Sequence, residues 1–229
     1  MEIVRASDSS LLIVFGDEIS IDLHYQVMAM FRAIRAMNDA RICNLHPGYA
    51  SLLIEYNPLQ MSYTELSLWV RALENTPESR SGHGAGTIDI PVCYDTEFGL
   101  DLLDVASHTH MSPEEVVRIH SSTTYVVYFL GFSPGFGYFG GLPPCLHTPR
   151  LATPRVFVAA GAVGIAGSQT GIYPIGSPGG WQLIGRTPLR MFDPEATPPT
   201  RLQPGALVKF SSIDRKTYDE FAQQPSNLK

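Results

Sequence analysis

Residues 120–193 decide the fold, and they read HSSTTYVVYFLGFSPGFGYFGGLPPCLHTPRLATPRVFVAAGAVGIAGSQTGIYPIGSPGGWQLIGRTPLRMFD. Glycine and proline interrupt this stretch every few residues, and short runs of β-branched and aromatic residues lie between them. The pattern predicts a closed β structure with long shaped loops. Because strands hold such loops in place and loops usually carry function, we expect the functional site here.

The composition bounds the class of protein. The 229 residues are enough for one large domain or two small ones, and 44% of them are hydrophobic while 17% are charged. The net charge of −6 and the lack of any basic run before Arg215-Lys216 argue against binding to nucleic acid. The longest early apolar run, Leu11 to Phe15, is too short to span a membrane. So few charges predict either a well-formed hydrophobic core or an apolar surface that a partner covers.

The three cysteines indicate the cellular compartment of the protein. Cys43, Cys93 and Cys145 are widely spaced and form no CxxC motif, which favours buried, reduced thiols. The first ten residues lack the character of a signal peptide. The sequence therefore predicts a cytoplasmic protein.

The first 74 residues predict a ββαββα unit, with one sheet and two helices on one face. Strands are expected at 2–6, 11–15, 41–45 and 52–56, and helices at 22–39 and after a capping box at 62–65. Residues 75–86 contain almost no large apolar group and mark the boundary between the domains. We expect an amino-terminal domain over 1–80 and a second domain over 87–229.

The second domain begins with a predicted strand at 87–94. Residues 97–108 are compatible with a helix, and a stronger helix starts at Ser112 with proline at its first position and ends near His120. A β-rich run covers 124–130, short strands and turns continue to 210, and a short helix is expected at 214–222.

Two familiar motifs occur and neither fits its context. Residues 131–135 match the G-x-S-x-G nucleophile elbow, but Pro134 has no N–H for an oxyanion hole and no helix follows Ser133. Residues 135–140 match G-x-G-x-x-G, but the glycine and prolines at 141–144 prevent the helix that would hold a pyrophosphate. We interpret residues 131–140 as a shaped loop with exposed aromatics at 132, 136, 138 and 139, which either packs over the barrel end or contacts a substrate or partner.

Five polar residues are candidates for the chemistry. His120 ends a helix, where a histidine can serve as acid or base or only interact with the helix dipole. Arg150 and Arg155 each follow a proline and suit an anionic small molecule, unless they pair with loop carbonyls. Gln169 and Tyr173 flank a turn expected at Gly171 and can orient an amide or lactam, or close the barrel.

The sequence predicts no metal site. His108 and His110 lie near an expected helix end without a carboxylate or thiol at ligand spacing. No HExxH, Walker A or EF-hand pattern is present. Trp181 is expected to pack in the core.

Several runs together carry a resemblance to a known family: GFSPGF at 131–136, PR at 149–150 and 154–155, QTGIYP at 169–174, and SPGGW at 177–181. In this combination the chain resembles the KipI / allophanate hydrolase subunit 1 family, and within it the branch formed by the B subunits of bacterial ATP-dependent 5-oxoprolinases. The resemblance covers nearly the whole chain and is strongest from about Ile88 to Phe210.

The resemblance implies an α+β protein with a small amino-terminal α/β sandwich domain and a carboxy-terminal cyclophilin-like β-barrel. It implies a multi-subunit enzyme that opens the lactam of 5-oxoproline to glutamate with ATP as co-substrate, in which this chain acts with the A and C subunits and is inactive alone. It also implies that the five polar residues line a small-molecule pocket. His120 and Arg155 would be catalytic, and Arg150, Gln169 and Tyr173 would bind the substrate.

One departure concerns a strand near that pocket: residues 159–163 read AAGAV where the family pattern is Pro-Ala-Gly-Ser-Val, so a hydroxyl is missing.

Other functions stay open. The same family contains an inhibitor of a histidine kinase and subunits of allophanate or urea amide hydrolases. Prolyl isomerase activity rests on the barrel fold alone.

Overall fold

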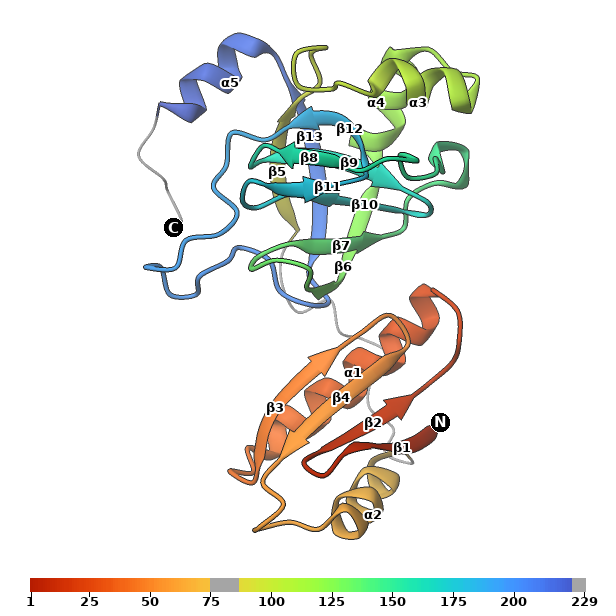
Figure 1. Cartoon of the computed structure of the whole chain (residues 1–229), viewed down its shortest axis with the longest axis vertical. Helices are drawn as coiled ribbons and strands as arrows, with labels where there is room; N and C mark the ends of the chain where they lie inside the picture. The colour runs from red at the N-terminus through yellow and green to blue at the C-terminus, as the bar shows by residue number, and fades with distance from the viewer. Residues whose placement is uncertain (75–86, 224–229) are drawn as a thin grey trace. The chain divides into compact units, whose positions relative to one another are not determined.

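The computed structural model describes residues 1–74 and 87–223, and the chain divides into two compact units, Met1–Gly84 and Ala85–Lys229 (Figure 1). The boundary predicted at 75–86 lies outside the described residues and stays a prediction. The fold class is confirmed: a small sheet with helices occupies one unit, and a closed β-barrel occupies the other. No helix in the described parts of the chain is long and apolar enough to cross a membrane.

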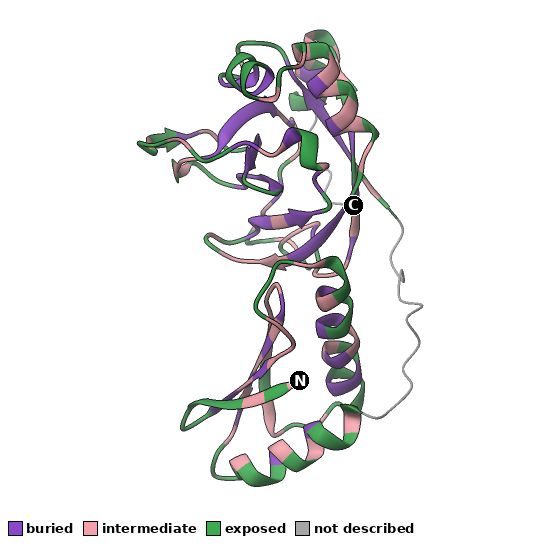
Figure 2. Ribbon diagram, turned by 90° about the vertical axis from the view of Figure 1, so that its right-hand side faces the viewer, coloured by how far each residue is buried: buried purple, intermediate pink, exposed green. Residues whose placement is uncertain are grey.

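The amino-terminal unit is a four-stranded antiparallel sheet in the order β1-β2-β4-β3 with two helices. Its elements are β1 (Glu2–Ser7), β2 (Ser10–Val14), α1 (Ile21–Met37), β3 (Ile42–Pro47), β4 (Ser51–Tyr56) and α2 (Tyr63–Glu74). Alternate residues of β2 and β4 are buried, as expected of a sheet with one covered face. Helix α1 runs along that face (Figure 2), and Leu66 and Val70 of α2 join the same core.

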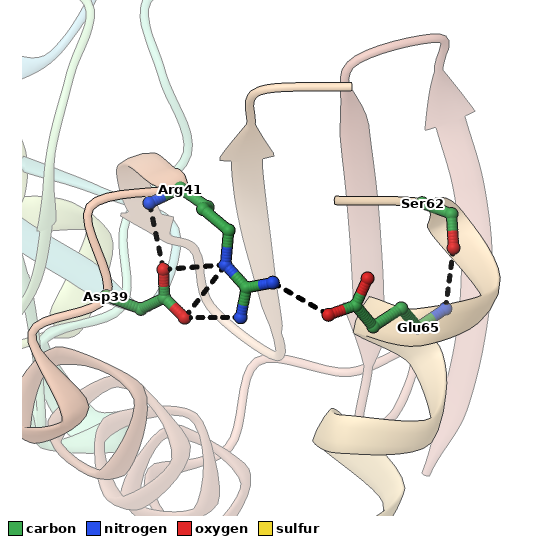
Figure 3. A network of polar contacts seen from close by, with 4 residues as sticks. All are labelled: Asp39, Arg41, Ser62 and Glu65. Carbon is green, nitrogen blue, oxygen red and sulfur yellow. Dashed lines mark hydrogen bonds and ion pairs between the residues drawn. The ribbon is translucent and has the colours of Figure 1, made fainter. Parts of the chain in front are cut away.

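A polar network joins the start of β3 to the start of α2 (Figure 3). Arg41 donates to Asp39 at 2.7 Å and to Glu65 at 2.7 Å, and the Ser62 hydroxyl accepts from the Glu65 N–H at 3.1 Å. The hydrogen bond from Arg41 lowers the pKa of Asp39 to about 2. The predicted helix start at Ser62 is confirmed, with the Glu65 side chain directed to Arg41.

The carboxy-terminal unit is a closed seven-stranded barrel in the order β10-β7-β6-β13-β5-β12-β9. Its strands are β5 (Ile88–Cys93), β6 (Thr124–Leu130), β7 (Gly137–Gly140), β9 (Ala162–Ala166), β10 (Gln169–Ile172), β12 (Gln182–Arg186) and β13 (Leu207–Ile213). Only β13 and β5 pair in parallel among these strands. A closed barrel has no free sheet edge, so its backbone groups are satisfied internally.

Further elements surround the barrel. They are α3 (Leu102–Thr109), α4 (Pro113–Ser122), a 3₁₀ turn (Pro144–Leu146), α5 (Arg215–Ala222), and a two-stranded ribbon of β8 (Arg155–Val158) and β11 (Ser177–Gly179). The cap predicted for α4 is confirmed, because the Ser112 hydroxyl accepts from the Glu115 N–H at 3.2 Å.

The helix expected over 97–108 begins later, at Leu102. The chain first makes a turn in which the N–H groups of Phe98 and Gly99 both donate to the Asp95 carbonyl at 2.8 Å. Gly99 then passes so close to the Ile184 carbonyl that a Cβ atom would lie 2.5 Å from its oxygen. Tertiary packing on β12 therefore delays the helix.

The barrel interior holds the main core of this unit, and Ile165 of β9 is fully buried in it. We predict that Ile165→Ala lowers the free energy of unfolding by about 2–5 kcal/mol, because it deletes buried methylene groups and leaves a cavity. Val156→Ala, at a residue 90% exposed in the same unit, should change it by about 0.5 kcal/mol or less. Urea unfolding of both variants measures the difference, and equal losses would contradict this description of the core.

Candidate functional site

Strand β10 separates two environments. It pairs with β9 and β7, and successive side chains along a strand point to opposite faces. Thr170 and Ile172 face the barrel interior, whereas Tyr173 packs in a second cluster outside it. By the same alternation Gln169 and Gly171 belong to the outer face. Four of the five predicted site residues lie on this outer side, and His120 lies on the inner one.

His120 stands inside the barrel in a chain of hydrogen bonds. Its Nδ1 lies 2.8 Å from the Tyr94 hydroxyl, and its Nε2 lies 2.9 Å from the Thr170 hydroxyl. The Thr170 hydroxyl donates its only proton to the Gly164 carbonyl at 2.9 Å, so it must accept from Nε2–H. Tyr94 then donates to Nδ1. The geometry thus fixes the tautomer of His120.

Burial also fixes the charge of His120. The side chain is fully buried and stacks on Phe210 with ring centroids 4.6 Å apart. Burial lowers the pKa of His120 to about 3, because a charged imidazole would lose its hydration. The same cause raises the pKa of Tyr94 well above its usual value. The neutral imidazole, with both nitrogens hydrogen-bonded, joins α4 to β10 across the barrel. It is shielded from the outer face.

The outer face carries an aromatic cluster. The ring centroid of Phe136 lies 5.3 Å from that of Tyr173 and 5.5 Å from that of Trp181, and Tyr138 lies 5.9 Å from Trp181. All three pairs are edge-to-face, the arrangement that aromatic quadrupoles favour. A side chain at position 171 would disturb this packing, because a Cβ atom there would lie 2.8 Å from the Gly137 carbonyl oxygen and 3.1 Å from the Trp181 ring.

Arg150 lies over this cluster. Its guanidinium carbon is 6.0 Å from the centroid of the Trp181 ring, and the residue is exposed. Burial raises the pKa values of Tyr138 and Tyr173, and the positive charge of Arg150 opposes both shifts. Among the described residues no carboxylate forms an ion pair with Arg150. This side chain is therefore an exposed cation above a largely buried aromatic cluster.

Arg155 has a structural partner that the sequence did not indicate. One terminal nitrogen, Nη2, lies 2.5 Å from Oδ1 of the buried Asp101, whose Oδ2 accepts from the Leu183 N–H at 2.6 Å. Asp101 thereby ties the ribbon strand β8 and strand β12 to the start of α3. The other nitrogen, Nη1, is buried and has no hydrogen-bond partner among the described residues. Arg155 retains one donor for a ligand.

The charges around this face follow a simple sequence pattern. Residues 116–192 contain no aspartate or glutamate, and they include five arginines. Strands β6 to β12 are therefore built without a carboxylate of their own. Asp101, from outside the stretch, pairs with Arg155. The pattern is visible in the sequence and points to an anion-binding face.

Several predictions about this region are wrong. Phe136 and Phe139 are buried and Tyr138 is partly buried, so Phe132 alone of the four aromatics is strongly exposed. Gly171 lies within strand β10, where no turn occurs. Both the exposure of the aromatics and the turn at Gly171 were predicted wrongly because burial in the outer cluster depends on contacts between residues far apart in the sequence.

Two further expectations concern cysteines and metals. Only Cys93 of the three cysteines is buried, and Cys43 and Cys145 are exposed. Within residues 1–74 and 87–223, no group of three or more His, Cys, Asp or Glu side chains could hold a metal ion.

Comparison with known proteins gives the family. Residues 1–202 match the family described as carboxyltransferase domain, subdomain C and D. The chain belongs to this family. It is 39% identical to the protein named as the B subunit of 5-oxoprolinase in Bacillus subtilis, over 97% of each chain. The expected resemblance to that branch is confirmed.

Two other relatives are longer than this chain. The crystal structure of TTHA0988 superposes with a TM-score of 0.79 at 36% identity, over 90% of this chain and 40% of that one. The protein named urea amidolyase of Saccharomyces cerevisiae is 22% identical over 97% of this chain and 14% of its own length. In both, the region similar to this chain is a minor part of a larger polypeptide.

The state of His120 generates a prediction about acid stability. The unfolded imidazole binds a proton below its usual pKa of about 6.5, whereas the folded one stays neutral down to about pH 3. Its contribution is therefore fully present above pH 6.5 and falls as the pH is lowered toward 3. From pH 7 to pH 5 the wild type should lose about 2 kcal/mol more unfolding free energy than His120→Gln.

Urea unfolding at the two pH values measures this difference. Thr170→Ser keeps the hydroxyl that accepts from Nε2 and should retain the acid sensitivity of the wild type. A free-energy difference between wild type and His120→Gln that does not change with pH would show that His120 is solvated or charged in the fold.

Proposed function

We propose that this chain is the B subunit of an ATP-dependent 5-oxoprolinase, which opens 5-oxoproline to glutamate together with the A and C subunits. The observation that carries the proposal is the 39% identity to a protein of that name over 97% of both chains. The outer face of β10 supports it, since an exposed cation lies there over an aromatic cluster in which Tyr138 is partly exposed. The substrate is a small ring that carries a carboxylate and a planar lactam.

Each part of the outer face has a task in this proposal. Arg150 binds the carboxylate of 5-oxoproline, because its guanidinium has no ion-pair partner in the described parts of the chain. The flat lactam lies against the rings of Trp181 and Tyr138. Gln169 and Tyr173 are buried here and form the wall that orients the lactam.

Arg155 is assigned to the reacting carbonyl. In the proposed step the lactam oxygen takes the γ-phosphoryl group of ATP and ADP leaves. Water then adds to the activated carbon and the C–N bond breaks to give an acyl phosphate, from which a second water releases phosphate and glutamate. Nη1 of Arg155, which has no hydrogen-bond partner among the described residues, is held in place by the Asp101 ion pair and donates to the oxygen that carries the phosphoryl group.

His120 has a different role from the one that the sequence predicted. Its imidazole is buried, neutral and bonded at both nitrogens, so the proposal does not use it as an acid or a base. It positions β10 instead, through Thr170. Because β10 also carries Gln169 and leads into Tyr173, this contact sets the wall of the outer site.

ATP is assigned to the assembled enzyme rather than to this chain. The glycine-rich run at 135–140 leads into strand β7 and does not open a helix that could hold phosphates. The proposal therefore needs the A and C subunits for nucleotide chemistry, and it expects this chain to be inactive alone.

The test is glutamate formation from 5-oxoproline and ATP by the purified A and C subunits, with and without this chain. Turnover that requires the chain supports the proposal. Absence of turnover with competent partners would refute it and favour a different amide substrate. Urea derivatives come first among these, because a urea amidolyase is a distant relative.

Arg150 gives a sharper prediction in the same assay. Arg150→Ala should raise KM for 5-oxoproline about 10- to 150-fold, the equivalent of a charged hydrogen bond worth about 1.5–3 kcal/mol. Arg190→Ala is the matched control, since Arg190 is an exposed arginine that already pairs with Asp193 at 3.2 Å. Equal KM values for the two variants would remove Arg150 from the site.

A further inference from the structure

Strands β8 and β11 form a ribbon that belongs to neither sheet. Among the strands that the structure describes they pair with each other and with no third one, through Ser177 opposite Val158 and Gly179 opposite Arg155. Figure 1 shows the ribbon in front of the barrel, and in the turned view of Figure 2 a largely exposed ribbon projects at the left of this unit. A two-stranded ribbon is marginally stable in water unless something packs against it.

The ribbon exposes large apolar side chains. Val156 is 90% exposed and Phe157 is 67% exposed, at the place where the pairing of β8 with β11 shifts register. Ile175 precedes β11 and is also exposed. The Phe157 ring lies over Gly176, where a Cβ atom would come within 2.7 Å of it. These exposed apolar side chains therefore lie on a structured element.

Positive charge flanks the ribbon at both ends. At one end Leu151, which follows Arg150, donates its N–H to the Gly180 carbonyl at 2.8 Å. At the other end Arg186 donates to the carbonyl of Ala160 at 2.8 Å. Neither Arg150 nor Arg186 forms an ion pair with a carboxylate among the described residues. A surface that covers the ribbon would therefore be apolar with carboxylates at its margins.

We propose that this ribbon is an arm that inserts into an apolar, acid-rimmed groove of the C subunit; the inference rests on the proposed function. The lengths of the relatives support a protein occupant. The matched family comprises subdomains C and D of a carboxyltransferase domain, and in TTHA0988 the similar region fills 40% of a longer chain. In this proposal another chain supplies the remainder of such a domain.

Docking of the arm also bears on the substrate site. Gly179 of β11 lies against the Tyr173 ring, so closely that a Cβ atom there would come within 2.7 Å of a ring carbon. Arg155 begins β8, and its Nη1 has no hydrogen-bond partner in the described parts of the chain. A partner that grips the arm covers the outer face and excludes water from it, which strengthens the arginine contacts to a bound anion. The site is complete only in the complex.

The experiment measures the affinity between this chain and the purified C subunit by calorimetry. Phe157→Asp and Val156→Asp should each raise Kd by about 30-fold or more, as for an interface residue worth about 2 kcal/mol. Leu68→Asp, at a residue 65% exposed on α2 of the other unit, is the matched control and should leave Kd unchanged. Both arm positions are exposed, so circular dichroism should show that the variants fold.

The outcomes separate the two proposals. If the wild type binds the C subunit and the arm variants bind equally well, the arm is not the interface and this inference fails while the proposed function stands. If the wild type does not bind the C subunit, the proposed partnership fails, and the inference with it. If the arm variants instead abolish a homodimer of this chain, a second copy is the occupant and the inference is overturned.

Discussion

The alternation of side chains along β10 is the constraint on which the rest of the barrel unit depends. One strand carries Thr170 into the barrel core and leads Tyr173 into a buried aromatic cluster outside it. Its inner face is held by a neutral histidine, and its outer face meets an arginine without an ion-pair partner in the described chain. A shift of register by one residue would exchange these faces. The hydrogen bond from His120 to Thr170 of β10 opposes that shift.

Solvent contact decides what each polar residue can do. His120 and Arg150 are both candidates in the sequence, but of the two only Arg150 is exposed to solvent. A buried imidazole loses its charge and becomes a fixed donor and acceptor, whereas an exposed guanidinium keeps its charge at any physiological pH. Arg155 lies between these cases, because Asp101 fixes one nitrogen while another has no hydrogen-bond partner in residues 1–74 and 87–223.

Much of the fold is predictable because its signals are local. The helix start at Ser112 and the strand at 124–130 follow from a cap and from a β-rich run, and both are confirmed. The helix start expected at 97 is wrong because Gly99 packs on β12, which is more than eighty residues away in sequence. Contacts between residues far apart in the sequence also limit what could be predicted of the site. Local patterns identify the arginines, but only the folded chain shows that β10 separates them from His120 and that Asp101 holds Arg155.

The central claim is that the substrate binds on the outer face of β10. The chain has two tryptophans, Trp69 on α2 and Trp181 in the outer cluster. Labelling both with 5-fluorotryptophan and adding 5-oxoproline to the assembled complex would test the claim by ¹⁹F NMR. We predict that the Trp181 resonance shifts with increasing 5-oxoproline while the Trp69 resonance stays in place. An active complex in which Trp181 does not respond to the substrate would contradict the account.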